Sequence, residues 1–273
     1  MNNEREALRQ VKRVVVKVGT STLTYENGKV NFTRIDKLTR VLSDLLNQDK
    51  EVVLVSSGAI GVGVGKLKLK KKPETVREKQ AVAAVGQCEL MHIYSKFFSE
   101  YGHTVGQILL TRDVVEEDHT RHNVINTFET LIENGIVPIV NENDSVSIDE
   151  IEYGEKRVFG DNDTLSAIVA ALVHADLLII LSDIDGFYDC DPRCNRDSHL
   201  LPIVREITPE IEMCAGGAGT RRGTGGMITK LTAAKMANGH GIDMVLASGE
   251  EPENILDVLS GKKIGTLFTG KSY

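Results

Sequence analysis

Several segments of this sequence combine glycines, lysines and hydroxyl groups in a way that suits the binding of an anion. Lys17 precedes a Gly-Thr-Ser sequence, and glycine-rich stretches occupy residues 58–65, 216–219 and 224–227. Such turns let backbone N–H groups approach an anion, and a helix that starts there adds the positive end of its dipole. Lys230 falls about one turn into the helix predicted after the last stretch, within reach of an anion at the helix start. The pattern predicts a site for phosphate groups.

The two common fingerprints for nucleotide phosphates do not occur. The sequence contains no G-x-x-x-x-G-K-[ST] motif and no G-x-G-x-x-G motif after a predicted strand. Neither a P-loop nor a dinucleotide-binding turn can therefore be inferred from the glycines alone. A dinucleotide-dependent oxidoreductase is disfavoured for the same reason.

Two acidic segments offer partners for positively charged groups. Residues 141–144 read Asn-Glu-Asn-Asp after an apolar run, and residues 160–163 read Gly-Asp-Asn-Asp at the start of a predicted helix. Asp and Asn are preferred at helix N-caps, so one member of the second segment is expected to be a cap. A cap does not account for three consecutive side chains that can bind an ammonium or a lysine.

The elements that must position these side chains follow from hydrophobic periodicity. Strands are predicted at residues 13–18, 52–55, 107–110, 136–140, 177–181 and 242–247. Helices are predicted at residues 33–48, 75–101, 119–134, 163–175 and 226–238. Thr33 and Asp36 are spaced like a capping box for the first helix, and Gly239 is expected to stop the last one.

Apolar strands that alternate with helices indicate a mainly parallel sheet covered on both faces, which is an α/β fold. In an open parallel sheet, ligands bind at the carboxyl ends of the strands. The polar segments described above follow directly after predicted strands. We therefore expect them to meet at one edge of the sheet and form an active site.

Composition excludes several other classes. The chain has 273 residues, a formal net charge of −7, no tryptophan and 5% aromatic residues, which argues against a nucleic-acid-binding protein. No apolar run approaches the ~18 residues of a membrane span, and the charged N-terminus does not resemble a signal peptide. Four cysteines are too few for a disulfide scaffold, so a reduced, cytoplasmic protein without a membrane partner is expected.

Two further groups of residues, one rich in lysine and one containing cysteines, are not assigned a functional role. The lysine-rich run at residues 66–72 is expected to be a solvated loop rather than a lid over anionic substrates. Cys190 and Cys194 lie near His199, but their spacing is not that of a usual zinc site, and no metal-binding residues are assigned. Cys88 falls in the predicted long helix and is expected to be buried.

At these residues the chain resembles the amino-acid kinase family, and within it the members that phosphorylate glutamate for proline biosynthesis. The resembling segments are VVVKVGTS (14–21), VVLVSSGAIGVG (52–63), KQAVAAVGQCELM (79–91), GQILLTRDV (106–114), IVPIVNENDSV (136–146), FGDNDTLSA (159–167), LSDIDGFYDCDPR (181–193), GTGGMITKLTAAKMA (223–237) and GTLF (265–268). They span nearly the whole chain. Many members carry an additional C-terminal PUA domain, which this chain is expected to lack.

The resemblance implies a three-layer α/β/α sandwich that forms a single domain over residues 1–273. Its part at about 1–174 would bind glutamate, and its part at about 175–270 would bind ATP. The implied reaction is ATP-dependent phosphorylation of the glutamate γ-carboxylate, with Mg²⁺ bridging the ATP phosphates. The implied partners are these small molecules, proline as a feedback inhibitor, and further copies of the chain in a dimer or tetramer.

The resemblance also assigns residues to roles. The implied catalytic residues are Lys17, Lys230 and Asp163, the last of which would orient the two lysines. The implied glutamate-binding residues are Ser57, Gly58, Asn141, Asp144 and Asn162. The implied ATP-binding residues are Lys17, Ser182, Asp183, Thr224, Gly225, Gly226, Met227, Ile228, Thr229 and Lys230. The loop at 147–158 is longer than in some members, so its contribution to inhibition and to subunit contacts stays open.

Two alternatives remain beside this interpretation. A kinase of the same fold could act on acetylglutamate, aspartate, carbamate or UMP, although the acidic segments suit a free α-ammonium, which acetylglutamate and UMP lack. A non-catalytic amino-acid sensor could retain the fold. The presence of both Lys17 and Lys230 argues against the sensor.

Overall fold

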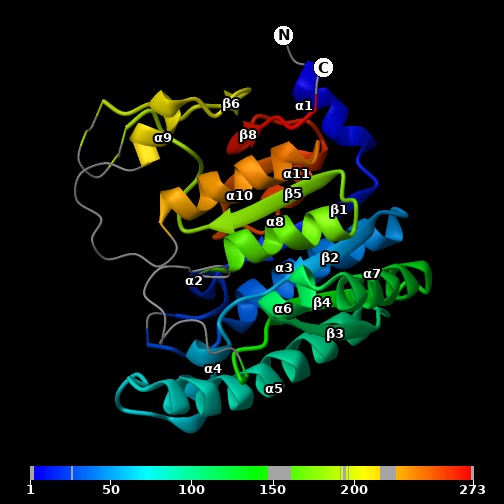
Figure 1. Ribbon diagram of the computed structural model, residues 1–273, viewed down its shortest axis with the longest axis vertical. Coiled ribbons are helices and arrows are strands. Elements are labelled where there is room, and N and C mark those ends of the chain that lie inside the picture. The colour runs from blue at the N-terminus through cyan, green and yellow to red at the C-terminus, as the bar shows by residue number, and fades with distance from the viewer. Residues whose placement is uncertain are drawn as a thin grey trace.

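A central sheet with helices on both faces makes up the protein (Figure 1). The computed structural model describes residues 3–25, 27–146, 161–190, 192, 195, 197–215 and 226–271. Within these residues the sheet has eight strands in the order β3-β4-β2-β1-β5-β7-β8-β6. The predicted three-layer α/β/α architecture is confirmed.

The sheet is parallel except at one side. Its strands are β1 (Arg13–Val18), β2 (Glu51–Val55), β3 (Val105–Leu110), β4 (Val137–Glu142), β5 (Leu177–Ser182), β6 (Ile203–Val204), β7 (Asp243–Ser248) and β8 (Thr266–Phe268). All pairings from β3 through to β7 are parallel, whereas β8 is antiparallel to β7. The short β6 then pairs with β8 in parallel. The central strands β1 and β5 are buried almost throughout, as expected for strands covered on both faces.

Two hydrophobic clusters separate the sheet from its helical layers. The first layer contains α3 (Phe32–Asn47), α5 (Val76–Glu100) and α11 (Asn254–Leu259), and the second contains α7 (Asp118–Glu133), α8 (Asn162–Leu172) and α10 (Met227–Gly239). Alternate residues of β1 face the two layers: Val14, Val16 and Val18 pack in the first cluster and Val15 in the second. Lys17 is two residues after Val15, so its side chain points to the same face of the sheet, toward the second layer.

The remaining helices are short. They are α1 (Asn3–Ala7), the 3₁₀ helix η1 (Leu8–Gln10), α2 (Thr20–Leu23), α4 (Ala59–Leu67), α6 (Arg112–Glu116) and α9 (Pro209–Ala215). Arg5 in α1 is 1% exposed and donates hydrogen bonds to backbone carbonyls of Ile264, Pro202 and Gly265. The N-terminal helix is thereby tied to the strand at the other end of the chain (Figure 1).

The prediction that residues 58–65 form a phosphate-binding turn is wrong for most of the segment. Gly58, with a φ of 90°, ends the turn, and α4 begins at the next residue. A Cβ on Gly63 would lie 2.1 Å from the carbonyl oxygen of Val82, and one on Gly86 would lie 1.7 Å from that of Ala59. These glycines allow α4 and α5 to pack backbone against backbone, which leaves Gly58 as the part of the segment that faces the sheet edge.

Several predicted details differ in the structure. Helix α3 begins at Phe32 with Asn31 as its N-cap, so Thr33 and Asp36 do not form its capping box. Helix α10 includes Gly239, and the left-handed residue that follows it is Gly241, with a φ of 71°. Helix α8 ends at Leu172, three residues earlier than predicted, because the chain turns at His174 with a φ of 48°. Cys88 is exposed rather than buried.

Candidate active site

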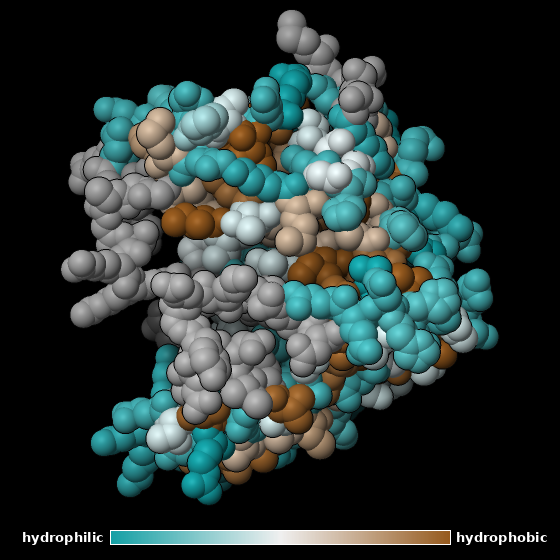
Figure 2. Space-filling view, in the orientation of Figure 1, coloured by the Kyte–Doolittle hydropathy of each residue, from teal (hydrophilic) through white to brown (hydrophobic). Residues whose placement is uncertain are grey.

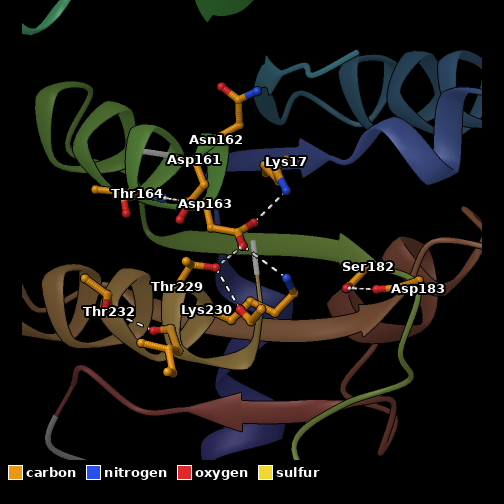
Figure 3. Close-up of polar contacts among 12 residues, drawn as sticks. Lys17, Asp161, Asn162, Asp163, Thr164, Ser182, Asp183, Thr229, Lys230 and Thr232 are labelled. Carbon is orange, nitrogen blue, oxygen red and sulfur yellow. Dashed lines mark hydrogen bonds and ion pairs between the residues drawn. The ribbon is translucent and has the colours of Figure 1, made fainter. Parts of the chain in front are cut away.

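Two lysines from distant parts of the chain meet on one carboxylate at the edge of the sheet (Figure 3). Lys17, near the end of β1, places its ammonium 2.6 Å from Oδ1 of Asp163. Lys230, in the first turn of α10, places its ammonium 3.1 Å from Oδ2 of the same residue. Thr229 also donates a hydrogen bond to Oδ2, at 3.0 Å. The predicted contact of Asp163 with both lysines is confirmed, and three segments are joined at one point.

All three charged side chains are nearly inaccessible to solvent. Lys17, Asp163 and Lys230 are 8%, 1% and 6% exposed. Burial alone would raise the pKa of Asp163, but the neighbouring charges of Lys17 and Lys230 and their hydrogen bonds outweigh it, so the pKa lies below its ordinary value. The carboxylate is therefore ionised at neutral pH. Asp163 therefore lies as a carboxylate between two ammonium groups.

The helix that carries Asp163 is fixed by its own N-terminus. Asp161 is the N-cap of α8 and accepts a hydrogen bond from the backbone N–H of Thr164 at 2.8 Å. This confirms that one acidic residue of 160–163 acts as a cap, while Asp163 faces the lysines. Ser166 donates to the carbonyl of Asp163 at 2.6 Å and secures the first turn.

Between Asp161 and Asp163, Asn162 reaches across to the end of β2. Its amide nitrogen donates to Oγ of Ser57 at 2.8 Å. The other end of the amide, Oδ1, is buried and accepts no hydrogen bond from the described residues. A buried acceptor without a partner is costly, so this oxygen is suited to a donor supplied by a ligand.

The Asn-Glu-Asn-Asp segment straddles the end of β4. Asn141 is 1% exposed and belongs to the strand, where its amide nitrogen donates to Oε1 of Gln87 on α5 at 2.8 Å. Asn143 and Asp144 follow in a turn and are partly exposed. Asp144 thus lies just beyond the strand end, on the same edge of the sheet as Ser57, because β2 and β4 are parallel neighbours.

The residues predicted to bind a nucleotide are partly brought together. Ser182 ends β5 and donates to the carboxylate of the exposed Asp183 at 2.9 Å. Gly226 is the N-cap of α10, with Met227, Ile228, Thr229 and Lys230 in its first turn; Ile228 is 55% exposed. Thr224 and Gly225, like Cys194 and the loop at 147–158, lie outside the described residues.

Two residues around the site were not predicted from the sequence. Gln87 holds Asn141, and Tyr94 forms a hydrogen bond of 3.0 Å with Ser56 beside Ser57. Burial raises the pKa of the Tyr94 phenol, so the group stays neutral. A carboxamide within the largely apolar buried face of α5 was the signal that could have identified Gln87.

A metal site made of protein side chains is not evident. The described residues contain no group of three or more His, Cys, Asp or Glu side chains that could hold a metal ion. The carboxylate of Asp163 is already engaged by two lysines. Magnesium is commonly held by substrate phosphates and water with only one or two carboxylates, so it does not require such a group.

The fold and the site define an α/β/α protein in which two buried lysines contact one aspartate at the carboxyl edge of the sheet. The chain belongs to the Amino acid kinase family, whose sequence profile matches residues 12–248. It is 70% identical to a glutamate 5-kinase of Clostridium perfringens, with 98% of each chain covered. It is 58% identical to a glutamate 5-kinase of Listeria monocytogenes, with 98% of this chain and 96% of the relative covered.

Solved structures agree on the fold. Carbamate kinase from Giardia lamblia, bound to AMP-PNP, superposes with a TM-score of 0.66 at 17% identity, covering 97% of this chain and all of that one. At this identity the similarity supports the architecture alone. None of the described helices combines the length and the apolar character needed to cross a membrane.

Proposed function

We propose that this protein transfers the γ-phosphoryl group of ATP to the γ-carboxylate of L-glutamate, the first step of proline biosynthesis. The observation that carries the proposal is the arrangement of Lys17 and Lys230 on opposite oxygens of Asp163, at the edge of the sheet where ligands of parallel α/β folds bind. The two relatives named glutamate 5-kinase share this length of chain at 58% and 70% identity.

The chemistry requires positioning rather than proton abstraction. A γ-carboxylate is ionised at neutral pH, so one of its oxygens can attack the γ-phosphorus directly while the bond from phosphorus to the ADP oxygen breaks. The products are L-glutamyl 5-phosphate and ADP. The main obstacle is the repulsion between two anions that must approach in line, which fixed positive groups can offset.

The two lysines are placed to supply that positive charge. Lys17 extends from the strand end between the two halves of the sheet, and Lys230 extends from the start of α10. Asp163 holds both ammonium groups in place before substrate arrives, so little reorganisation is needed during transfer. Mg²⁺, carried in on the ATP phosphates, would add further neutralisation.

Glutamate is proposed to bind in the half at about 1–174 and ATP in the half at about 175–270. Ser57, Gly58, Asn141, Asp144 and Asn162 surround the ends of β2, β4 and the start of α8. The buried Oδ1 of Asn162 and the carboxylate of Asp144 are acceptors suited to the substrate α-ammonium. Ser182, Asp183 and the start of α10, from Thr224 to Lys230, are proposed for ATP.

The phosphoryl acceptor is tested by comparing product formation with several candidate substrates. The protein is supplied with ATP, Mg²⁺ and hydroxylamine, and hydroxamate and ADP are measured with glutamate, acetylglutamate, aspartate, carbamate and UMP. We expect hydroxamate and ADP in equal amounts with glutamate and much less product with the others. Faster turnover with another acceptor would assign that substrate instead, and ADP formation with no acceptor would contradict the proposal.

Two further properties are proposed with it. Proline, which shares the α-carboxylate and the amino group of glutamate, is expected to inhibit in competition with glutamate. Unchanged activity at millimolar proline and low glutamate would exclude that control. The protein is also expected to form a homodimer or homotetramer, which light scattering after size-exclusion chromatography measures directly.

A further inference from the structure

A cavity lies beside the turn that follows β1. It has a volume of about 820 Å³ and is lined by the α2 segment, the start of α3, one face of α4 and the chain between α4 and α5. This volume is within the range of pockets that hold small organic ligands. None of the residues assigned above to glutamate, ATP or catalysis lines it.

The cavity is strongly positive although the protein as a whole is negative. Arg34, Lys70, Lys71, Lys72 and Lys79 line it, and Glu250 is the only carboxylate among its described lining residues. The formal charge of the lining is therefore positive in a chain whose net charge is −7. Such a concentration of one sign focuses anions toward the cavity.

The lysines that follow α4 differ from Lys66 in their surroundings. Lys66 forms an ion pair of 2.8 Å with Glu89. Within the described part of the chain, Lys70, Lys71 and Lys72 form no ion pair, and all three are exposed. Figure 2 shows the hydrophilic side chains gathered at the end of the molecule where α4 and α5 meet. The lysine-rich run therefore supplies charge to a cavity rather than only to open solvent.

The floor of the cavity combines fixed polar groups with apolar ones. Arg34 donates to the carbonyl of Ser21 at 3.0 Å, which holds its guanidinium at the cavity wall, and Asn31 caps the helix that carries it. Ile60, Val64 and Leu69 provide an apolar surface beside these groups. A ligand with phosphates at one end and an apolar portion at the other would match both parts.

The wall between the cavity and the active site is thin. The Thr20 side chain lines the cavity and lies 3.5 Å from the position that a Cβ would take on Gly58. Gly19, one residue earlier, is similarly close to the ammonium of Lys17, at 3.8 Å from its Cβ position. A ligand that contacts Thr20 would therefore press on the turn that adjoins the proposed glutamate site.

We propose that this cavity is a second anion site, which binds a small phosphorylated organic molecule of the nucleoside polyphosphate class and changes the affinity for glutamate. The existence of the site does not depend on the proposed function. Its effect on the KM for glutamate does rest on that function.

The test measures binding and kinetics on matched variants. The pocket variant replaces Lys70, Lys71 and Lys72 by Gln, and the control variant replaces Lys96, Lys262 and Lys263 by Gln. These control lysines are exposed and do not line this cavity. Both changes alter the net charge equally. Equilibrium dialysis with inorganic triphosphate, and separately with GTP, is performed with AMP-PNP and Mg²⁺ saturating the nucleotide site.

We expect triphosphate to bind the wild type and the control equally and the pocket variant about tenfold more weakly, as several exposed charge interactions together allow. Tighter binding of GTP than of triphosphate would indicate that the apolar surface of the cavity contacts the nucleobase. Equal binding would indicate that the cavity recognises only the polyphosphate chain. Equal affinities in all three proteins would overturn the site.

The kinetic arm uses saturating ATP and varied glutamate. The added polyphosphate is expected to change the KM for glutamate in the wild type and the control but not in the pocket variant. If binding is lost in the pocket variant while the KM never responds in any protein, the coupling through Thr20 is wrong. If none of the three proteins phosphorylates glutamate, but the pocket variant still binds triphosphate more weakly than the other two, the proposed function fails and the second anion site is retained.

Discussion

Lys17 and Lys230 come from opposite ends of the chain and contact opposite oxygens of the same buried carboxylate. The first lysine is set by a central strand and the second by the first turn of a helix, so neither depends on a loop for its position. Asp163 places one negative charge between the two ammonium groups, and all three side chains are nearly inaccessible to solvent. This arrangement supports the proposal that an acidic protein binds an anionic substrate at this edge of the sheet.

Removal of either lysine should reduce turnover far more than glutamate binding. Lys17→Ala and Lys230→Ala each delete a positive group that faces the transferring phosphoryl, where charge is redistributed in the transition state. We expect kcat to fall about 10²–10³-fold, as for the loss of one preorganised donor, with a much smaller rise in the KM for glutamate.

Lys235→Ala is the matched control, because Lys235 lies on the same helix as Lys230 but is exposed and paired with Glu212. It should leave kcat unchanged. A near-normal kcat for Lys17→Ala or Lys230→Ala would remove that lysine from the catalytic role.

Asp163→Asn should destabilise the protein in a pH-dependent way. The pKa of Asp163 is lowered in the folded state, so its ionised form contributes stability that is complete above about pH 4 and is lost as the pH falls through the folded-state pKa. At pH 7 the variant leaves two buried ammonium groups without their carboxylate, which should lower the free energy of unfolding by about 3–5 kcal/mol.

Denaturant titrations between pH 7 and pH 2 measure this difference. The gap between the wild type and Asp163→Asn should narrow below pH 4, because the wild type then loses the same charge. A gap that stays constant across that range would show that the ion pairs do not stabilise the fold.

Asp144→Asn should impair glutamate binding alone. A carboxylate that pairs with a substrate ammonium in a partly desolvated site contributes about 2–5 kcal/mol, so the KM for glutamate should rise at least about 30-fold. ATP affinity and the midpoint of thermal unfolding should remain near those of the wild type.

The alternative role of Asp144 is to support the turn after β4. In that case the thermal midpoint would drop and the KM would barely move. Asp118→Asn, on the exposed surface of α7, controls for the general effect of removing a negative charge.

The glycines of α4 should differ sharply in their tolerance of a side chain. A Cβ on Gly63 meets the carbonyl of Val82 at 2.1 Å, whereas one on Gly61 meets only the methyl group of Thr20 at 3.2 Å. Gly63→Ala should lower the free energy of unfolding by about 1–3 kcal/mol or more through overpacking. Gly61→Ala should stay within about 1 kcal/mol of the wild type, since alanine favours the helix.

ATP affinity provides the second readout for this pair. If the glycines serve helix packing, Gly61→Ala should bind ATP normally. Weaker ATP binding with unchanged stability would restore the phosphate-binding interpretation of residues 58–65.

Long helices and strands were predictable from the sequence because the regular spacing of their apolar residues shows which face of each element is buried. All six predicted strands and all five predicted helices exist, and the strand ends do bring Lys17, Ser57, Asn141 and Ser182 to one edge. The ends of elements were harder. The left-handed residue after α10 is Gly241 rather than Gly239, and α3 is capped by Asn31. Both features depend on backbone angles that several nearby residues can adopt.

Short elements and tertiary packing were not predictable. The run 58–65 has the composition of a phosphate-binding turn, and only the presence of α5 against it shows that its glycines are needed for close helix contact. Strands β6 and β8 have two and three residues, too few for a periodic signal. The contact of Gln87 with Asn141 joins α5 to β4 and has no local signature beyond a polar residue on an apolar face.

The path of one oxygen atom tests the proposed phosphoryl transfer to the γ-carboxylate. Glutamate labelled with ¹⁸O in its γ-carboxylate is incubated with the protein, ATP, Mg²⁺ and hydroxylamine, and the released phosphate is analysed by mass spectrometry. Attack of the γ-carboxylate on phosphorus makes that oxygen the bridge to phosphate, and hydroxylamine then expels it with the phosphate. We expect one ¹⁸O in each phosphate and none when only the α-carboxylate is labelled. Unlabelled phosphate from γ-labelled glutamate would contradict the proposed transfer.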